Sequence, residues 1–423
     1  MKRYLYLPKQ YDLVVGEPFE LFFRGIVNSV SIDTYDFELF YDDGKNRGKG
    51  FSRKYYFVPE ESDLGAHTLH IRLYNNEGEV MDEATCVINV VNPPVSPEEE
   101  RVVLLVGASD ASPGVWPSEV GRRLLGTGGE PAGLGLHNIS FIGSRERDGI
   151  RYEGYGGWNF RSYITDNKRD DFMILSGDFS DKDPAVDQHS SYRDENGLLW
   201  KLETITPTKM KIISHNALGV LPSTAGGRLV HATGGENLGD IVYTSAERAD
   251  ANPFWDAERG SNNFHAYAAR FGKTKIDEIV VTLTWNSFAW PTEAYERAMR
   301  GFIASVHAEF PECHITLVGG LFPSRDGFGQ NYGISWPWFT RLATLRTFDE
   351  IREGIALEDP AHLSFLNFAS RYDVDYNGIY AEFPANNRNQ TPITLGSNGL
   401  HIGPGGSKQL SDAIFTHLAT RLQ

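Results

Sequence analysis

The stretch "VLLVGASDASPGVWPSEVGRRLL" (residues 103–125) predicts an α/β fold and marks a place for chemistry in it. The apolar run 103–106 predicts a buried strand, and residues 117–125 predict a helix. The turn between them carries Ser109 two residues after Gly107. Strand ends of open α/β sheets display reactive groups, and the N–H groups at the start of the next helix favour negative charge. Ser109 is therefore a candidate nucleophile, although Gly and Ser are also ordinary turn residues.

Composition limits the classes of partner. The chain has 423 residues and a formal net charge of −16, which suits two or three soluble domains and argues against nucleic acid as a ligand. No apolar run approaches the ~18 residues of a membrane span. Cys86 and Cys313 fall in different predicted domains, so we expect two buried thiols and no disulfide.

The N-terminal stretch "MKRYLYLPKQYDLVVGEPF" has a basic start but no apolar signal region, because Pro8 and Lys9 interrupt it. It predicts a first strand. We expect a mature secreted, periplasmic or cell-surface chain whose signal peptide has been removed, with a cytoplasmic protein as the alternative.

Two domains are predicted. Residues 1–92 alternate like short strands around turns, which predicts an all-β immunoglobulin-like sandwich, and the proline- and glutamate-rich residues 93–100 predict a linker. Residues 101–423 alternate strands with helices, which predicts a mostly parallel sheet with helices on both faces. Strands are predicted at 102–106, 138–142, 279–284, 314–319 and 363–367, and helices at 117–125, 263–272, 292–309, 339–355 and 405–422. Residues 171–262 break this rhythm and predict a β-rich insertion made of hairpins.

A nucleophilic serine needs a base and donors for the oxyanion. His401 lies in the glycine-rich stretch "LGSNGLHIGPGG", just before the C-terminal helix, and is the candidate base. The glycines of "YEGYGGWNF" permit a tight backbone whose N–H groups point outward, so Gly157 is one candidate donor. Asn286 ends the predicted strand in "VVTLTWNSFAW" and is a second. Each stretch by itself is also compatible with a plain turn or a helix start.

Taken in order, "GAS", "EGYGGW", "TWNS" and "NGLH" resemble the conserved blocks of the SGNH (GDSL-type) hydrolase superfamily. The resemblance covers roughly residues 101–165 and 276–423. With the β-sandwich in front, the chain looks like SGNH esterases of bacterial polysaccharide-degrading systems. The resemblance implies a flavodoxin-like three-layer α/β/α fold, no cofactor, Ser109 as nucleophile, His401 as base, and an oxyanion hole formed by Ser109, Gly157 and Asn286.

The sequence departs from the family pattern at several positions. Ala108 replaces an aspartate beside the nucleophile, and Thr284 and Ser287 replace the Gly and Asp around Asn286. Asn398 stands where the family's catalytic acid precedes the histidine.

Three arrangements fit the asparagine: His401 leans on a backbone carbonyl, another carboxylate such as Asp110 reaches it, or the enzyme is weak or inactive. We favour the first two, and therefore expect Asn398→Asp to be neutral or harmful.

Aromatic residues beside the blocks favour a sugar substrate. Tyr155, Trp158, Trp285 and Trp290 flank the candidate site and are predicted substrate contacts. No metal-binding motif is present. The expected activity is removal of O-acyl groups, most simply acetyl, from an acetylated poly- or oligosaccharide. The alternatives are a catalytically impaired glycan-binding protein and an acylhydrolase acting on lipid esters. The sequence leaves the oligomeric state open.

Overall fold

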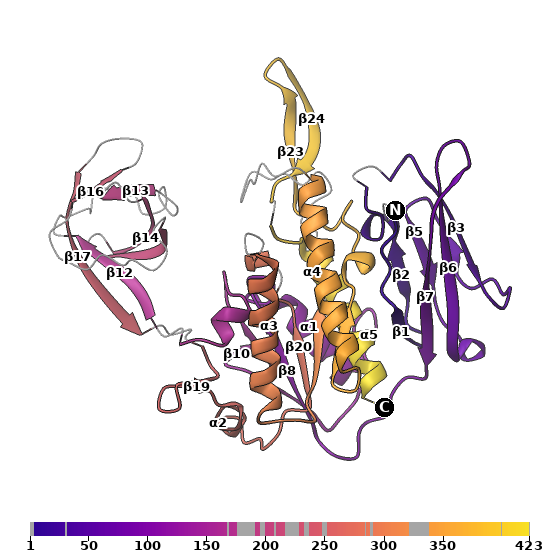
Figure 1. Ribbon diagram of the computed structural model, residues 1–423, viewed down its shortest axis with the longest axis horizontal. Helices are drawn as coiled ribbons and strands as arrows, with labels where there is room; N and C mark the ends of the chain where they lie inside the picture. Colours follow the sequence, from indigo (N-terminus) through magenta and orange to yellow (C-terminus); the bar gives the residue numbers. More distant parts are fainter. Residues whose placement is uncertain are drawn as a thin grey trace. The chain divides into compact units, whose positions relative to one another are not determined.

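The computed structural model describes residues 4–29, 32–166, 169–175, 191–194, 199–206, 209–215, 228–231, 237–247, 252–283, 285–287, 291–320, 338–398 and 400–422. The chain forms two compact units. Residues 1–164 and 261–423 form the main unit, and residues 165–260 form the barrel unit. Figure 1 shows the elements along the chain.

The N-terminal part of the main unit consists of two β-sheets. One sheet has the strand order β1 (Gln10–Val14), β7 (Val80–Val91), β6 (Gly65–Tyr74) and β3 (Asp36–Tyr41). The other has the order β2 (Phe19–Phe22), β5 (Lys54–Phe57) and β4 (Lys49–Gly50), and the short 3-10 helices η1 (Phe23–Gly25) and η2 (Glu61–Asp63) lie in the connections. Phe19, Tyr55, Leu69 and Ile88 from both sheets share one buried core. Residues 1–92 thus form a β-sandwich; its immunoglobulin-like connectivity remains a prediction.

A mostly parallel sheet forms the centre of the main unit. Its parallel strands are β8 (Arg101–Gly107), β9 (Ile139–Ile142), β20 (Glu278–Val281), β21 (His314–Val318) and β22 (Leu363–Leu366). β11 (Ile150–Gly154) also runs parallel to β8 and pairs with its last residues, and β10 (Arg145–Arg147) pairs antiparallel with β11. Strand β8 is apolar on both faces because it is covered on both, as central parallel strands are. All five predicted strands of the α/β region are confirmed.

The strand order identifies where a ligand would bind. Counted along the chain, strands β9, β8, β20, β21 and β22 lie in the order 2-1-3-4-5, so the direction of winding reverses between β8 and β20. In open α/β sheets, ligands bind outside the carboxyl ends of the strands at this switch point. The chain leaves β8 there through Ala108 and Ser109.

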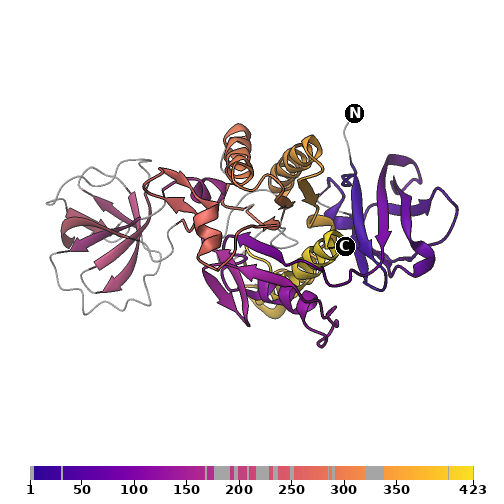
Figure 2. The same ribbon diagram turned by 90° about the horizontal axis from the view of Figure 1, so that it is seen from below.

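In the part of the chain that the structure describes, five α-helices accompany the sheet, and each of the five predicted helices is confirmed. They are α1 (Val115–Leu125), α2 (Phe264–Ala269), α3 (Thr292–His307), α4 (Trp338–Glu358) and α5 (Pro404–Arg421). Helix α1 packs against α5, and α4 packs against β22. Figure 2 shows α3 and α4 on one side of the strands and α5 on the other. The α/β class is confirmed, and the exact three-layer arrangement remains a prediction.

The sandwich packs directly on the α/β region. The Tyr11 hydroxyl donates a buried hydrogen bond of 2.8 Å to Ser370 Oγ in η5 (Ala369–Arg371). Arg346 of α4 donates to Asn28 Oδ1 at 2.9 Å and to the Gly25 carbonyl. These hydrogen bonds are buried or partly buried, so the sandwich and the α/β region form an interface that is largely shielded from solvent.

The barrel unit contains a closed six-stranded barrel. Its strand order is β12 (Arg169–Leu175), β15 (Lys209–His215), β14 (Leu199–Thr206), β13 (Ser191–Asp194), β16 (Arg228–His231) and β17 (Asn237–Glu247). Two short strands follow along the chain, β18 (Trp255–Asp256) and β19 (Ser261–Asn262). The hairpins predicted from "NGLLWKLETITPTKMKIISHN" and "GRLVHATGGENLGDIVYTS" correspond to the antiparallel pairs β14–β15 and β16–β17. The barrel unit covers 165–260, against the predicted insertion 171–262.

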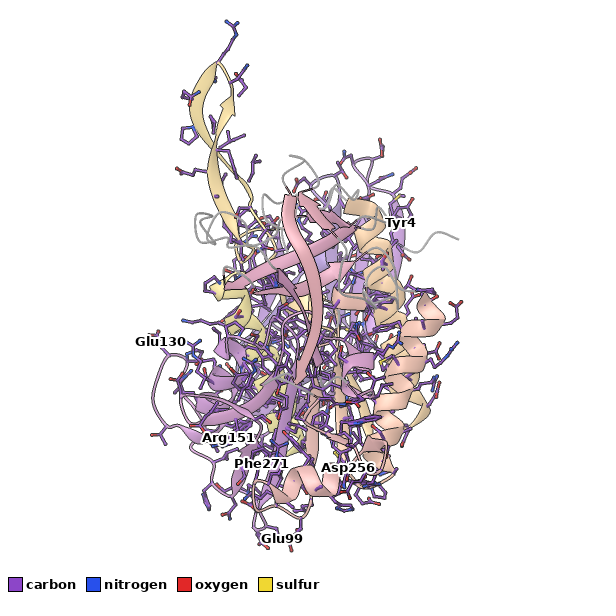
Figure 3. The ribbon with its side chains drawn as sticks, turned by 90° about the vertical axis from the view of Figure 1, so that its left-hand side faces the viewer. Tyr4, Glu99, Glu130, Arg151, Asp256 and Phe271 are labelled. Carbon is purple, nitrogen blue, oxygen red and sulfur yellow. The ribbon has the colours of Figure 1, made fainter. Side chains whose placement is uncertain are left out.

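One element of the main unit was not expected from the sequence. Strands β23 (Tyr380–Asn386) and β24 (Asn389–Gly396) form an antiparallel hairpin, and all of β24 except Gly396 is exposed. Figure 3 shows the hairpin as a two-stranded projection with side chains pointing outward on both faces. The chain runs from this hairpin directly into the loop that carries His401.

Candidate active site

Ser109 lies in the turn that leaves β8. A hydrogen bond stabilises the start of this turn: the Tyr163 hydroxyl of η3 (Phe160–Tyr163) donates to the Gly107 carbonyl at 2.9 Å. The Ser112 N–H donates to the Ala108 carbonyl at 2.9 Å. Ser109 itself is only half-buried, so its hydroxyl is presented on a rigid turn at the sheet's switch point.

Asp110 holds this turn together. One carboxylate oxygen accepts from the Ala108 N–H at 3.0 Å. The other accepts from Trp116 Nε1 at 3.1 Å and from the Thr282 hydroxyl at 2.5 Å, which ties the turn to α1 and to the end of β20. Burial raises the pKa of Asp110, and these hydrogen bonds oppose that rise. Both oxygens of Asp110 thus hold the turn. A role of Asp110 in orienting His401 stays a prediction.

The structure brings together the two residues predicted as nucleophile and base. His401 Nε2 lies 2.9 Å from Ser109 Oγ, although the two are 292 positions apart in the chain. Burial lowers the pKa of the His401 imidazole below its ordinary value of 6.5. A neutral imidazole at hydrogen-bond distance from a hydroxyl has the geometry of a general base.

Asn398 contacts the other nitrogen of the imidazole. Its Oδ1 accepts from the Leu400 and His401 N–H groups, each at 2.9 Å, so the network assigns the amide nitrogen to the side facing His401. Asn398 Nδ2 lies 3.4 Å from His401 Nδ1. A donor at Nδ1 favours the tautomer with its proton on Nε2, whereas a base needs Nε2 free.

At 3.4 Å this contact is longer than an ordinary hydrogen bond, so the preference it imposes is weak. The contact nevertheless reverses the expectation for Asn398→Asp. A carboxylate at this position would accept a proton from Nδ1 and leave Nε2 free toward Ser109.

The predicted oxyanion donors lie on neighbouring elements. Gly154 at the end of β11 pairs in register with Gly107 at the end of β8, so the glycine turn and the serine turn leave the sheet side by side. Gly157 is exposed and has a φ of +81°, a conformation that favours glycine. Asn286 Nδ2 donates a 2.8 Å hydrogen bond to the Trp158 carbonyl, which joins the second and third sequence blocks. One amide N–H of Asn286 is thereby used and a second remains on the same nitrogen.

Two of the four predicted aromatic contacts, Tyr155 and Trp158, are buried. Tyr155 and Trp158 are each 3% exposed, their ring centroids lie 4.3 Å apart, and the Tyr155 hydroxyl donates to Glu153 at 2.6 Å. Their placement as substrate contacts does not fit this burial, because two buried rings offer almost no surface to a sugar. The Trp285 side chain and all of Trp290 lie outside the described residues.

Glu153 supports the glycine turn from inside the protein. It is fully buried and accepts hydrogen bonds from the Tyr155 hydroxyl, the Tyr267 hydroxyl and the Ser144 N–H, at 2.6, 2.6 and 2.7 Å. The neighbouring Arg151 guanidinium lies 5.8 Å from the centre of the Phe271 ring; both residues are labelled in Figure 3. The supporting role of Glu153 was not predicted from the sequence, although an acidic residue within the strand "IRYEG" could have indicated a buried carboxylate.

Within the described ranges, no group of three or more His, Cys, Asp or Glu side chains is arranged to hold a metal ion. No described helix is long and apolar enough to cross a membrane. Cys86 and Cys313 are both buried and free, which confirms the prediction of two buried thiols.

No family model matches the chain, and no curated protein matches its sequence. Among solved structures, it is similar to a carbohydrate esterase family 2 enzyme plus carbohydrate binding domain from Corynascus thermopiles (Myceliophthora fergusii), at 10% identity and a TM-score of 0.32. That match covers 97% of this chain and 92% of the other.

Two further structures are similar over less of the chain. A peptidoglycan O-acetylesterase matches at 10% identity and a TM-score of 0.33, covering 77% of this chain and 92% of that one. A possible lipase from Chitinophaga pinensis DSM 2588 matches at 10% identity and a TM-score of 0.34, covering 76% and 99%. At these TM-scores the likenesses carry no weight for fold or function.

Proposed function

We propose that the protein is a serine ester hydrolase with Ser109 as nucleophile and His401 as general base. The observation that carries the proposal is the 2.9 Å separation of Ser109 Oγ and His401 Nε2 at the switch point of the parallel sheet. The lowered pKa of His401 supports it, because the imidazole stays neutral at physiological pH.

The reaction then follows the chemistry of acyl transfer. His401 Nε2 takes the Ser109 hydroxyl proton as Oγ attacks the ester carbonyl. The Ser109 and Gly157 N–H groups and the Asn286 amide donate to the oxyanion. The leaving hydroxyl departs with the proton from His401, and the acyl group stays on Ser109. Water repeats the sequence, releasing the carboxylic acid and restoring the serine.

The substrate class is proposed from the sequence blocks. Their resemblance to the SGNH superfamily supports a flavodoxin-like three-layer hydrolase that removes acetyl groups from an acetylated poly- or oligosaccharide without a cofactor. This proposal also places the protein outside the cell or in the periplasm.

Asn398 favours a second candidate function. Its amide faces His401 Nδ1 where a carboxylate would stabilise the imidazolium, so a catalytically impaired glycan-binding protein is the alternative. An acylhydrolase of lipid esters is a third outcome for the assay to distinguish.

The test is acetate release from a panel of acetylated glycans, run beside acetyl, octanoyl and palmitoyl esters, with parent protein and Ser109→Ala. We expect faster release of acetate from glycans, and no hydrolysis by the variant. Preference for the long chains would identify a lipid acylhydrolase. Glycan binding without hydrolysis would support the impaired protein.

A further inference from the structure

The His401 loop (residues 397–403, of which 399 is not described) rests on a second segment of the α/β region, residues 372–379, which we term the strap. The Gly403 N–H donates to the Asn377 carbonyl at 2.9 Å, and Gly378 forms an antiparallel bridge with Ile402. At the other end of the loop, the Ser397 N–H donates to the Ile379 carbonyl at 2.8 Å. The strap therefore holds the His401 loop on both sides of the histidine.

The glycines after His401 permit this close approach. A Cβ atom at Gly403 would lie 2.6 Å from the Gly378 carbonyl oxygen. A Cβ atom at Gly405 would lie 2.3 Å from Asn377 Oδ1. Any other residue at Gly403 would meet the strap backbone and displace the loop, and one at Gly405 would displace the Asn377 side chain, so the stretch "HIGPGG" is fitted to the strap.

The opposite side of the strap is held by the β-sandwich. Both terminal guanidinium nitrogens of Arg53, Nη1 and Nη2, donate to Asp373 at 2.9 and 3.1 Å, and Nη1 also donates to Asp375 at 3.2 Å. Arg24 forms an ion pair with Asp375 at 3.0 Å, and the Arg53 guanidinium lies 4.5 Å from the centre of the Tyr376 ring. Two arginines of the first 92 residues thus clamp two carboxylates of one short segment.

The carboxylates that Arg53 pairs with are largely buried, so they depend on the arginine for stabilisation. The side chains of Asp373 and Asp375 are only 12% and 11% exposed, whereas Arg53 is 35% exposed. Removing Arg53 would take its ion pair away from Asp373, while Asp375 would keep its ion pair with Arg24. The poorly solvated Asp373 carboxylate would then be driven toward water, which costs more than losing a surface pair. Asp373 cannot move alone, because its N–H donates to Gln409 Oε1 at 3.0 Å and that oxygen also accepts from Asn377 Nδ2 at 2.8 Å.

We propose that Arg53, a residue of the N-terminal β-sandwich, is a positioning residue for His401. It acts through the strap: Arg53 fixes Asp373 and Asp375, the strap fixes the His401 loop, and the loop sets Nε2 at bonding distance from Ser109. Through Arg53, the sandwich then contributes to the hydrolysis of small esters. This inference rests on the proposed function, in which His401 is the base.

The experiment compares full-length variants. Arg53→Met removes the charge and keeps the chain length, and Arg53→Lys keeps the charge without the two-pronged geometry. Arg47→Met is the matched control, since Arg47 also pairs with two aspartates, Asp43 and Asp63, but within the sandwich. Each variant is assayed on p-nitrophenyl acetate, with kcat, KM and the pH profile measured separately.

We expect Arg53→Met to lower kcat about ten-fold or more with little change in KM, because small misplacements of catalytic groups are costly. Arg53→Lys should recover part of this loss. The Arg47→Met control should stay within about two-fold of the parent, as expected for a distant site. A kcat for Arg53→Met equal to the parent's, in an enzyme that Ser109→Ala inactivates, overturns the inference and leaves the proposed function intact.

Hydrogen exchange provides a readout that needs no activity. Peptides covering 372–379 and 397–403 should exchange faster in Arg53→Met than in the parent or in Arg47→Met. If the parent proves inactive, the proposed function fails while this measurement still decides the coupling. Unchanged exchange in the 397–403 peptide overturns the inference.

Discussion

The substitution Asn398→Asp places a carboxylate beside the imidazole that the account makes the catalytic base. The carboxylate would stand near His401 Nδ1, from which Asn398 Nδ2 is 3.4 Å away. Opposite charges about 4 Å apart interact by about 1 kcal/mol in water and about 4 kcal/mol near a protein surface. At about 1.4 kcal/mol per unit, the pKa of His401 should rise by roughly 1 to 3 units.

The tautomer should change as well. One oxygen of the introduced carboxylate would still accept from the Leu400 and His401 N–H groups, and the second oxygen would accept from Nδ1–H. Nε2 would then be free to take the Ser109 proton. In a serine protease the reverse change, Asp to Asn, costs about 10⁴ in kcat. Because the parent contact is weak, we expect a smaller gain, about ten-fold or more in kcat.

The assay is the pH dependence of kcat and kcat/KM on p-nitrophenyl acetate. In the parent, the acidic limb of kcat/KM should have its midpoint below 6.5, since burial lowers the pKa of His401 and the base works only when neutral. In Asn398→Asp that limb should move to higher pH. Asn389→Asp, in the turn at the start of β24, adds the same charge on an exposed residue and serves as the control. An unchanged limb and an unchanged kcat would refute the reasoning and mean that another group already governs His401.

Three further predictions concern the serine turn, a buried histidine and the sandwich. Asp110→Asn should lower the free energy of unfolding by about 2 to 3 kcal/mol and reduce kcat, because an amide cannot accept from all three donors; urea titration and kinetics measure this. Burial lowers the pKa of His417 to about 4 in the folded protein, because it disfavours the charged imidazole. The unfolded state therefore binds more protons than the folded state between pH 6.5 and 4. The free energy of unfolding should fall by up to about 3 kcal/mol as the pH falls through that window. His417→Gln should flatten this dependence, which denaturation at several pH values measures. Removing residues 1–92 should lower the thermal midpoint and the activity on small esters; a fully active, equally stable 101–423 fragment would contradict the account.

Much of the α/β region could be predicted from local pattern. Strand β8 is a continuous apolar run because it is buried on both faces, and its end at Gly107 is visible in the sequence. The meeting of Ser109 and His401 is not a local property. Only the order of the four blocks indicated it, and the 2.9 Å separation agrees with that prediction.

The environments of single side chains could not be predicted in the same way. Tyr155 and Trp158 are residue types that commonly stack on sugars, but here the two rings pack on each other and Tyr155 bonds to the buried Glu153. The sequence does not indicate on which side of a turn an aromatic ring lies. The hairpin β23–β24 was not predicted, because β24 lacks the alternation of apolar and polar residues that predicts a strand. The reason is that all of β24 except Gly396 is exposed. The strap was missed because its signal is the pairing of Asp373 and Asp375 with Arg53, which lies 320 and 322 positions away.

The most direct test of the central claim is whether Ser109 is an activated nucleophile. Purified parent protein is treated with phenylmethanesulfonyl fluoride, and the modified peptide is located by mass spectrometry while hydrolysis of p-nitrophenyl acetate is followed. The account predicts one label per chain on Ser109, loss of activity in proportion to labelling, and neither labelling nor hydrolysis in Ser109→Ala. Hydrolysis by Ser109→Ala at the parent's rate, or labelling at another serine that accounts for the activity, would contradict it.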